Sequence, residues 1–164
     1  MTLTLPKRVA EFEALAFARE KESWIRRHLE ERGADVRVGP GAEIPIGGKM
    51  HRVVPGSGRR VTFAPGEVSV PGAPERIGRR LEGHLKQIAR SRLAEASDDY
   101  AARLGRPYSA LTLRDTRSRW GSCTSDGRLM YSWRLIMTPP EVLDYVVAHE
   151  AAHCLLYTSD AADE

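Results

Sequence analysis

The chain has 164 residues, of which 41% are hydrophobic and 29% are charged, and it contains two cysteines. These values are typical of one globular domain with its own core, and they exclude a disordered chain or a disulfide-rich scaffold. No apolar run approaches the roughly 20 residues that span a bilayer, and no secretory signal opens the chain, so we predict a cytoplasmic protein.

The net charge of +3 conceals a strong asymmetry. Residues 1–134 carry a net charge of +9, whereas residues 135–164 carry −6. A basic body can attract nucleic acid or acidic substrates. It can equally be an ordinary solvated surface, and charge alone does not distinguish the two.

The N-terminal half alternates between helical and strand-like patterns. The stretch LTLP (residues 3–6) is typical of a strand end, and residues 10–32 predict a helix that ends before Gly33. Residues 39–74 are rich in glycine and proline, with short alternating runs between them, which predicts hairpin strands of a small sheet. A long helix follows from Pro74 to about Leu104.

The next segment predicts a β-hairpin and then a last helix. Leu111 and Leu113 alternate with polar residues, and RLMYSWRLI (residues 128–136) follows the turn signal Ser125–Gly127. Thr138 as N-cap, Pro139 at the first helical position and Glu141 in a capping box predict a helix from about Pro139 to at least His153.

This last helix carries the sequence His149-Glu150-Ala151-Ala152-His153, which matches H-E-x-x-H. Residues four apart lie one turn apart on the same helix face, so two imidazoles can bind one tetrahedral ion. Glu150 flanks the site and can accept a proton from water. His149 and His153 continue an apolar face, so we expect them on a semi-buried side, converging near the Trp120–Trp133 hairpin. His51 and His84 are interpreted as ordinary strand and helix residues.

The two cysteines, Cys123 and Cys154, lie far apart in the sequence. The spacing favours two free thiols in a reducing compartment. Cys154 directly follows His153, and neighbouring helix residues do not share a face, so it is a poor third ligand.

The segment TRSRWGSCTSDGRLMYSWRLIMTPPEVLDYVVAHEAAH resembles the core of the YgjP-type metallopeptidase family, which is similar to the wider SprT and zincin-like group. The resemblance covers about residues 1–153. It implies an α+β, zincin-like fold with a small, mostly antiparallel sheet and long helices. It also implies a Zn²⁺-dependent peptidase that acts on peptides or proteins, with His149 and His153 as metal ligands and Glu150 as the catalytic base. Trp120, Gly121 and Ser122 would lie on a substrate-binding strand, although core packing is an equal alternative for Trp120 and Trp133.

The chain departs from the family after the second histidine. The family has a third histidine about six residues on, followed by Phe-Trp, where this chain has Ser159 in LLYTSDAADE. We therefore expect a metallopeptidase domain over residues 1–154, a non-native tail over residues 155–164, weak zinc binding and no activity. The alternatives are a DNA-associated SprT-like protein and a metal-free structural domain.

Overall fold

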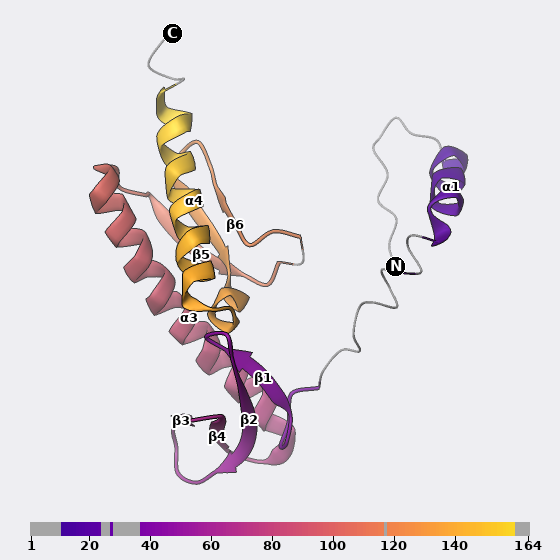
Figure 1. Cartoon of the computed structure of the whole chain (residues 1–164), viewed down its shortest axis with the longest axis vertical. Coiled ribbons are helices and arrows are strands. Elements are labelled where there is room, and N and C mark those ends of the chain that lie inside the picture. Colours follow the sequence, from indigo (N-terminus) through magenta and orange to yellow (C-terminus); the bar gives the residue numbers. More distant parts are fainter. Residues whose placement is uncertain (1–10, 24–26, 28–36, 117, 160–164) are drawn as a thin grey trace. The chain divides into compact units, whose positions relative to one another are not determined.

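The computed structural model describes residues 11–23, 27, 37–116 and 118–159 (Figure 1). The chain divides into two compact units, residues 1–36 and 37–164. In the first unit, helix α1 spans Glu11–Glu20 and leaves Phe12 and Phe17 exposed. The predicted helix is thus confirmed over its first part, whereas its predicted end and the strand at LTLP lie outside the described residues.

The second unit begins with a four-stranded sheet. Its strands are β1 (Glu43–Ile46), β2 (Lys49–Gly56), β3 (Thr62–Ala64) and β4 (Glu67–Pro71), in the order β1-β2-β4-β3. The pairs β1–β2 and β3–β4 are antiparallel hairpins, as predicted, whereas β2 and β4 pair in parallel. Each hairpin is closed by the turn between its two strands, and the parallel pairing of β2 with β4 joins the two hairpins into one sheet.

The β1–β2 turn connects this sheet to the start of the last helix. Gly47 and Gly48 both have positive φ, which glycine adopts at no steric cost. Their N–H groups donate to the carbonyl oxygens of Ile136 and Met137, at 2.9 and 3.1 Å. A Cβ on Gly48 would lie 2.7 Å from Cγ of Pro139, so this close approach also requires glycine.

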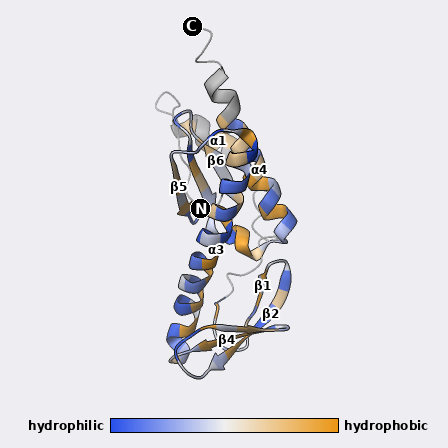
Figure 2. Cartoon of the chain, turned by 90° about the vertical axis from the view of Figure 1, so that its left-hand side faces the viewer, coloured by the Kyte–Doolittle hydropathy of each residue, from blue (hydrophilic) through white to orange (hydrophobic). Residues whose placement is uncertain are grey.

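Helix α3 spans Pro74–Leu104, as the sequence predicts. It ends at Gly105, whose left-handed conformation (φ 63°) suits a residue without a side chain. Figure 1 shows α3 running beside both sheets, and Figure 2 shows apolar and hydrophilic residues alternating along it. Its buried face contributes Ile77, Leu81, Leu85, Ala89, Leu93 and Ser97.

A second sheet contains β5 (Ala110–Arg114), β6 (Gly121–Cys123) and β7 (Arg128–Ser132), in the order β5-β7-β6. The sequence predicted a hairpin between β5 and β7, and this prediction is wrong. The hairpin is formed by β6 and β7 around the Ser125–Gly127 turn, and β5 pairs with β7 in parallel. Tripeptide β6 is too short, and too polar, to be recognised as a strand from its pattern.

The predicted strand over residues 128–136 is also too long. It ends at Ser132, and η1 (Trp133–Met137) is a 3₁₀-helix. The consecutive residues Leu135 and Ile136 are both buried, whereas a strand would direct them to opposite faces. A helical turn lets both side chains enter the core.

Tyr131 of β7 lies at the centre of this core. Its side chain is fully buried, and Ser97 donates a hydrogen bond to its hydroxyl oxygen at 3.4 Å. Burial raises the pKa of Tyr131 to about 12, and the negative charge of Glu150 adds to the increase. The phenol therefore stays neutral at physiological pH.

Helix α4 spans Pro140–Ser159, which confirms the helix predicted through His153. The hydroxyl of Thr138 does not form the expected capping box. It donates to the carbonyl oxygen of Leu135 at 2.8 Å, and the backbone N–H of Thr138 donates to the same oxygen at 3.2 Å, so Thr138 caps the end of η1. None of the helices in the described part of the chain is long and apolar enough to cross a membrane.

The α+β class is confirmed, but the single, mostly antiparallel sheet is not. The described residues form two small sheets, and each contains one parallel pair. The largest fully buried side chains come from both sheets, α3, η1 and α4, and they include Val53, Val68, Leu81, Leu93, Leu129, Tyr131, Leu135 and Val147.

Candidate metal centre

The two histidines of α4 converge on one point. The Nε2 atoms of His149 and His153 are 3.1 Å apart, the ring centroids are 4.6 Å apart and the ring planes meet at 87°. Two nitrogens bound to one tetrahedral zinc at roughly 2.0–2.1 Å would lie about 3.3 Å apart. The pair therefore fits a zinc ion with little rearrangement, as the spacing of the motif predicts.

The helix face around the histidines is more open than the sequence indicates. His149 is exposed and His153 is half-buried, whereas Val142 and Tyr145 are also exposed, Tyr145 to 69%. The Tyr145 ring stacks on His149 with a centroid distance of 6.2 Å. The predicted semi-buried side is therefore confirmed only in part: Val146, on the same face, is half-buried and packs against the core, whereas Val142 and Tyr145 meet solvent. An open face gives a large substrate access to the pair.

Glu150 points away from this open face and into the fold. It is 8% exposed and lies beside β6, where a Cβ on Gly121 would be 2.8 Å from Oε1 of Glu150. Residue 150 is rotated by about 100° from residue 149 on the helix, which brings it against the sheet. The side chain of Glu150, which adjoins His149 in the sequence, therefore packs against β6.

The described part of the chain shows no third ligand for the pair. Within residues 11–23, 27, 37–116 and 118–159, no group of three or more His, Cys, Asp or Glu side chains could hold a metal ion. His51 and His84, the other histidines of the second unit, both contact the Phe63 ring: His51 edge-to-face with a centroid distance of 6.3 Å, and His84 stacked at 5.8 Å. They are packed against an aromatic side chain of the four-stranded sheet.

Comparison with known families bears on what this helix does. The family described as "YgjP-like, metallopeptidase domain" matches residues 1–157, almost the whole chain. The chain belongs to this family. It is therefore a metallopeptidase-type domain, as the resemblance of its motifs implies. No curated protein and no solved structure matches the chain.

In this YgjP-like domain, β6 carries the residues predicted to bind substrate. Gly121 and Ser122 belong to β6, which is an edge strand of its sheet, and Trp120 directly precedes it. The carbonyl oxygen of Trp120 accepts from the N–H of Ser132 at 2.8 Å, while its side chain is 51% exposed. Core packing, the alternative for Trp120, is therefore wrong.

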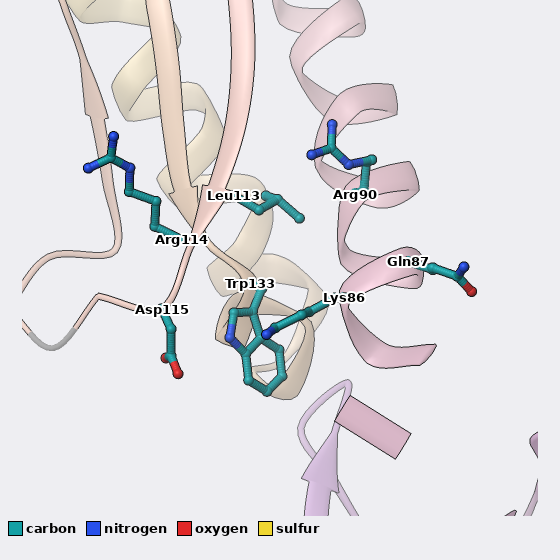
Figure 3. A pocket seen from close by; sticks show the side chains of 7 residues that line it. All are labelled: Lys86, Gln87, Arg90, Leu113, Arg114, Asp115 and Trp133. Atoms are coloured by element: carbon teal, nitrogen blue, oxygen red, sulfur yellow. The ribbon is translucent and has the colours of Figure 1, made fainter. Parts of the chain in front are cut away.

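Trp133 does lie in the core, 5% exposed, in line with the packing alternative for this residue. It lines a pocket of about 310 Å³ between α3 and the end of β5, together with Lys86, Gln87, Arg90, Leu113, Arg114 and Asp115 (Figure 3). Lys86 and Arg134 place their charged groups 5.5 and 4.9 Å from its ring. The indole is a packing residue for α3.

Arg134 also fixes the end of β5. Its Nε and Nη2 donate to the two carboxylate oxygens of Asp115 at 2.7 and 3.1 Å. These hydrogen bonds lower the pKa of Asp115 below its usual value. A second cavity, of about 630 Å³, lies between α3 and the first turns of α4, and none of His149, Glu150 and His153 lines it. Neither cavity is the candidate metal centre.

The prediction of two free thiols is wrong, because Cys123 and Cys154 form a disulfide. Their Cα atoms are 6.1 Å apart, although 31 positions separate them in the sequence. Gly121 and Cys123 lie two apart on one face of β6, and Glu150 and Cys154 lie four apart on one face of α4. Two strand residues advance about 6.6 Å and four helical residues about 6 Å, so the two pairs meet in register. The cysteines therefore no longer support a reducing compartment.

Reduction of this disulfide is expected to lower the melting temperature of the domain by about 10 °C. A bond that closes a loop of this length contributes roughly 3–4 kcal/mol, chiefly by restricting the unfolded chain. Thermal unfolding with and without dithiothreitol measures the effect. The double variant Cys123→Ala/Cys154→Ala is the control, since its melting temperature should be low and insensitive to the reductant. A change under about 2 °C in the unaltered chain would contradict the prediction.

Proposed function

We propose that this chain is a zinc-dependent metallopeptidase domain in which His149 and His153 hold the metal and Glu150 is the general base. The observation that carries the proposal is the 3.1 Å separation of the two Nε2 atoms beside a buried carboxylate. Bound zinc would supply Lewis acidity to water and to the scissile carbonyl group.

The carboxylate of Glu150 acts as the proton acceptor in this proposal. It adjoins His149 in the sequence but lies on a different helix face, so it is available as a base rather than as a ligand. The base takes a proton from the attacking water and passes it to the leaving amine. Its burial beside β6 keeps the carboxylate in one orientation before the substrate arrives.

Strand β6 would bind the substrate. An edge strand offers unpaired backbone groups to an extended peptide, which joins the sheet as one more strand. Trp120, Gly121 and Ser122 lie at the point where β6 passes Glu150, so a peptide along this edge would bring its carbonyl groups near the histidine pair. The exposed indole of Trp120 offers apolar area to a substrate side chain.

Zinc titration of the chain tests the ligand assignment. We expect weak binding at a stoichiometry of one, and we expect His149→Ala and His153→Ala each to weaken it by at least about tenfold, since each removes one of two protein ligands. His51→Ala is the matched control, because His51 packs against Phe63 and should leave zinc affinity unchanged. Unchanged affinity in both α4 variants would reject the proposed site.

A further inference from the structure

Gly121 of β6 faces a single residue of α4 at unusually short range. A Cβ built on Gly121 would lie 2.6 Å from Cγ, 2.8 Å from Oε1 and 3.0 Å from Cδ of Glu150. Non-bonded carbon atoms prefer separations of about 3.5–4.0 Å, so a methyl group here would overlap with the Glu150 side chain. The three nearest atoms all belong to this one residue.

The backbone of Gly121 does not itself require glycine. It is not among the residues with positive φ, unlike Gly47, Gly48 or Gly127. An alanine could therefore adopt the same backbone conformation. The reason for glycine at this position is the space that the Glu150 side chain fills.

Glu150 has little room to avoid such an overlap. It is nearly buried, and on the same side of α4 it is flanked by Val147, which is fully buried, and by Cys154. The Cys123–Cys154 disulfide ties that side of the helix to β6 only two residues beyond Gly121. The helix therefore cannot move away as a body, and a methyl group at position 121 would displace the carboxylate itself.

We infer that Gly121 is a positioning residue for Glu150: its missing side chain lets β6 hold the carboxylate in one place beside the histidine pair. This assigns Gly121 a role distinct from substrate binding. The importance of that placement for catalysis rests on the proposed function, whereas the contact between the two residues does not.

A double-mutant cycle tests the contact in the chain as it is. Gly121→Ala is expected to lower the melting temperature by roughly 4–10 °C, as for other overpacked sites. In the Glu150→Ala background, which removes all three clashing atoms, the same substitution should cost less than about 2 °C. Gly39→Ala is the matched control, because a Cβ there has no neighbour within 4 Å and the backbone φ is not positive. An equal loss in both backgrounds, or no loss in either, would overturn the inference.

A second measurement separates positioning from general destabilisation. In the chain labelled with ¹³C at the glutamate carboxyl carbons, the Glu150 signal is assigned by its loss in Glu150→Ala. Gly121→Ala should shift that signal, and Gly39→Ala should leave it in place. An unmoved Glu150 signal in Gly121→Ala would show that the carboxylate is not displaced.

Kinetics then tests what the placement does. In a variant that has peptidase activity, Gly121→Ala is expected to lower kcat at least about tenfold while KM and zinc affinity stay unchanged. A raised KM with unchanged kcat would contradict the positioning role and would indicate that Gly121 acts in substrate binding. If no variant with Gly121 intact hydrolyses peptides, the proposed function fails, and the melting and carboxyl measurements still decide whether Gly121 positions Glu150.

Discussion

Replacing the residues after Cys154 with a family-like extension is expected to raise zinc affinity at least about 100-fold and to bring peptidase activity. The extension carries a short polar stretch and a histidine near position 159, the place of the third histidine in the resemblance. Catalytic zinc sites have three protein ligands and one water, whereas the proposed site has two, His149 and His153, and no group of three or more candidate ligands occurs among the described residues. Changes in residues that merely support a ligand already alter metal affinity by 10–100-fold, so a whole ligand should exceed that range.

The single substitution Ser159→His is the matched control for this extension, and it should not raise the affinity. Helix α4 continues to Ser159, so position 159 lies six residues, or about 9 Å along the helix axis, beyond His153. A histidine on an unbroken helix cannot reach the same ion at that distance. The polar stretch is needed because the chain must leave the helix and turn back.

Competitive titration of zinc against a chromophoric chelator measures both variants, and a fluorogenic peptide library measures hydrolysis. Equal zinc affinity in the unaltered and extended chains would contradict the prediction. So would robust hydrolysis by the unaltered chain, because its third ligand would then come from another residue. His51→Ala and His84→Ala would be the first variants to examine in that case.

Glu150→Gln is expected to reduce hydrolysis by about 10²–10⁴-fold in the extended chain while zinc stays bound. The amide has nearly the same shape as the carboxylate, so it should fit the space beside Gly121 without the destabilisation expected of Gly121→Ala. It cannot accept a proton from water, so it removes the base alone. Zinc affinity should change by no more than a few-fold, because Glu150 is assigned as a base and not as a ligand.

Glu141→Gln is the control for this substitution. Glu141 lies in the first turn of the same helix, is exposed and is remote from the histidine pair in the sequence. Its loss should leave turnover within about twofold, since surface substitutions of this kind have small effects. Near-normal turnover in Glu150→Gln would show that Glu150 is not the general base. Loss of zinc together with activity would show that Glu150 is a metal ligand.

Several features of this protein could be predicted from local sequence alone. The apolar residues of α3 recur at helical spacing and end at Gly105, so both bounds of that helix are correct. The i, i+4 spacing of His149 and His153 puts both side chains on one helix face, one turn apart, where their rings can meet. These features depend only on residues within a few positions of one another, and the physics that sets them is equally local.

Tertiary structure decided the features that join distant segments. The parallel pairing of β5 with β7, the 3₁₀ turn after Ser132 and the disulfide between Cys123 and Cys154 all depend on contacts between residues far apart in the chain. The same holds for Gly121: the reason for a glycine at this position is the neighbouring Glu150 side chain, which is 29 residues away in the sequence. The periodicity of each segment indicates which face it buries. Only the packed fold shows that β6 and α4 lie together so that two residues of β6 advance by nearly the same distance as four residues of α4, which brings Gly121 to Glu150 and Cys123 to Cys154.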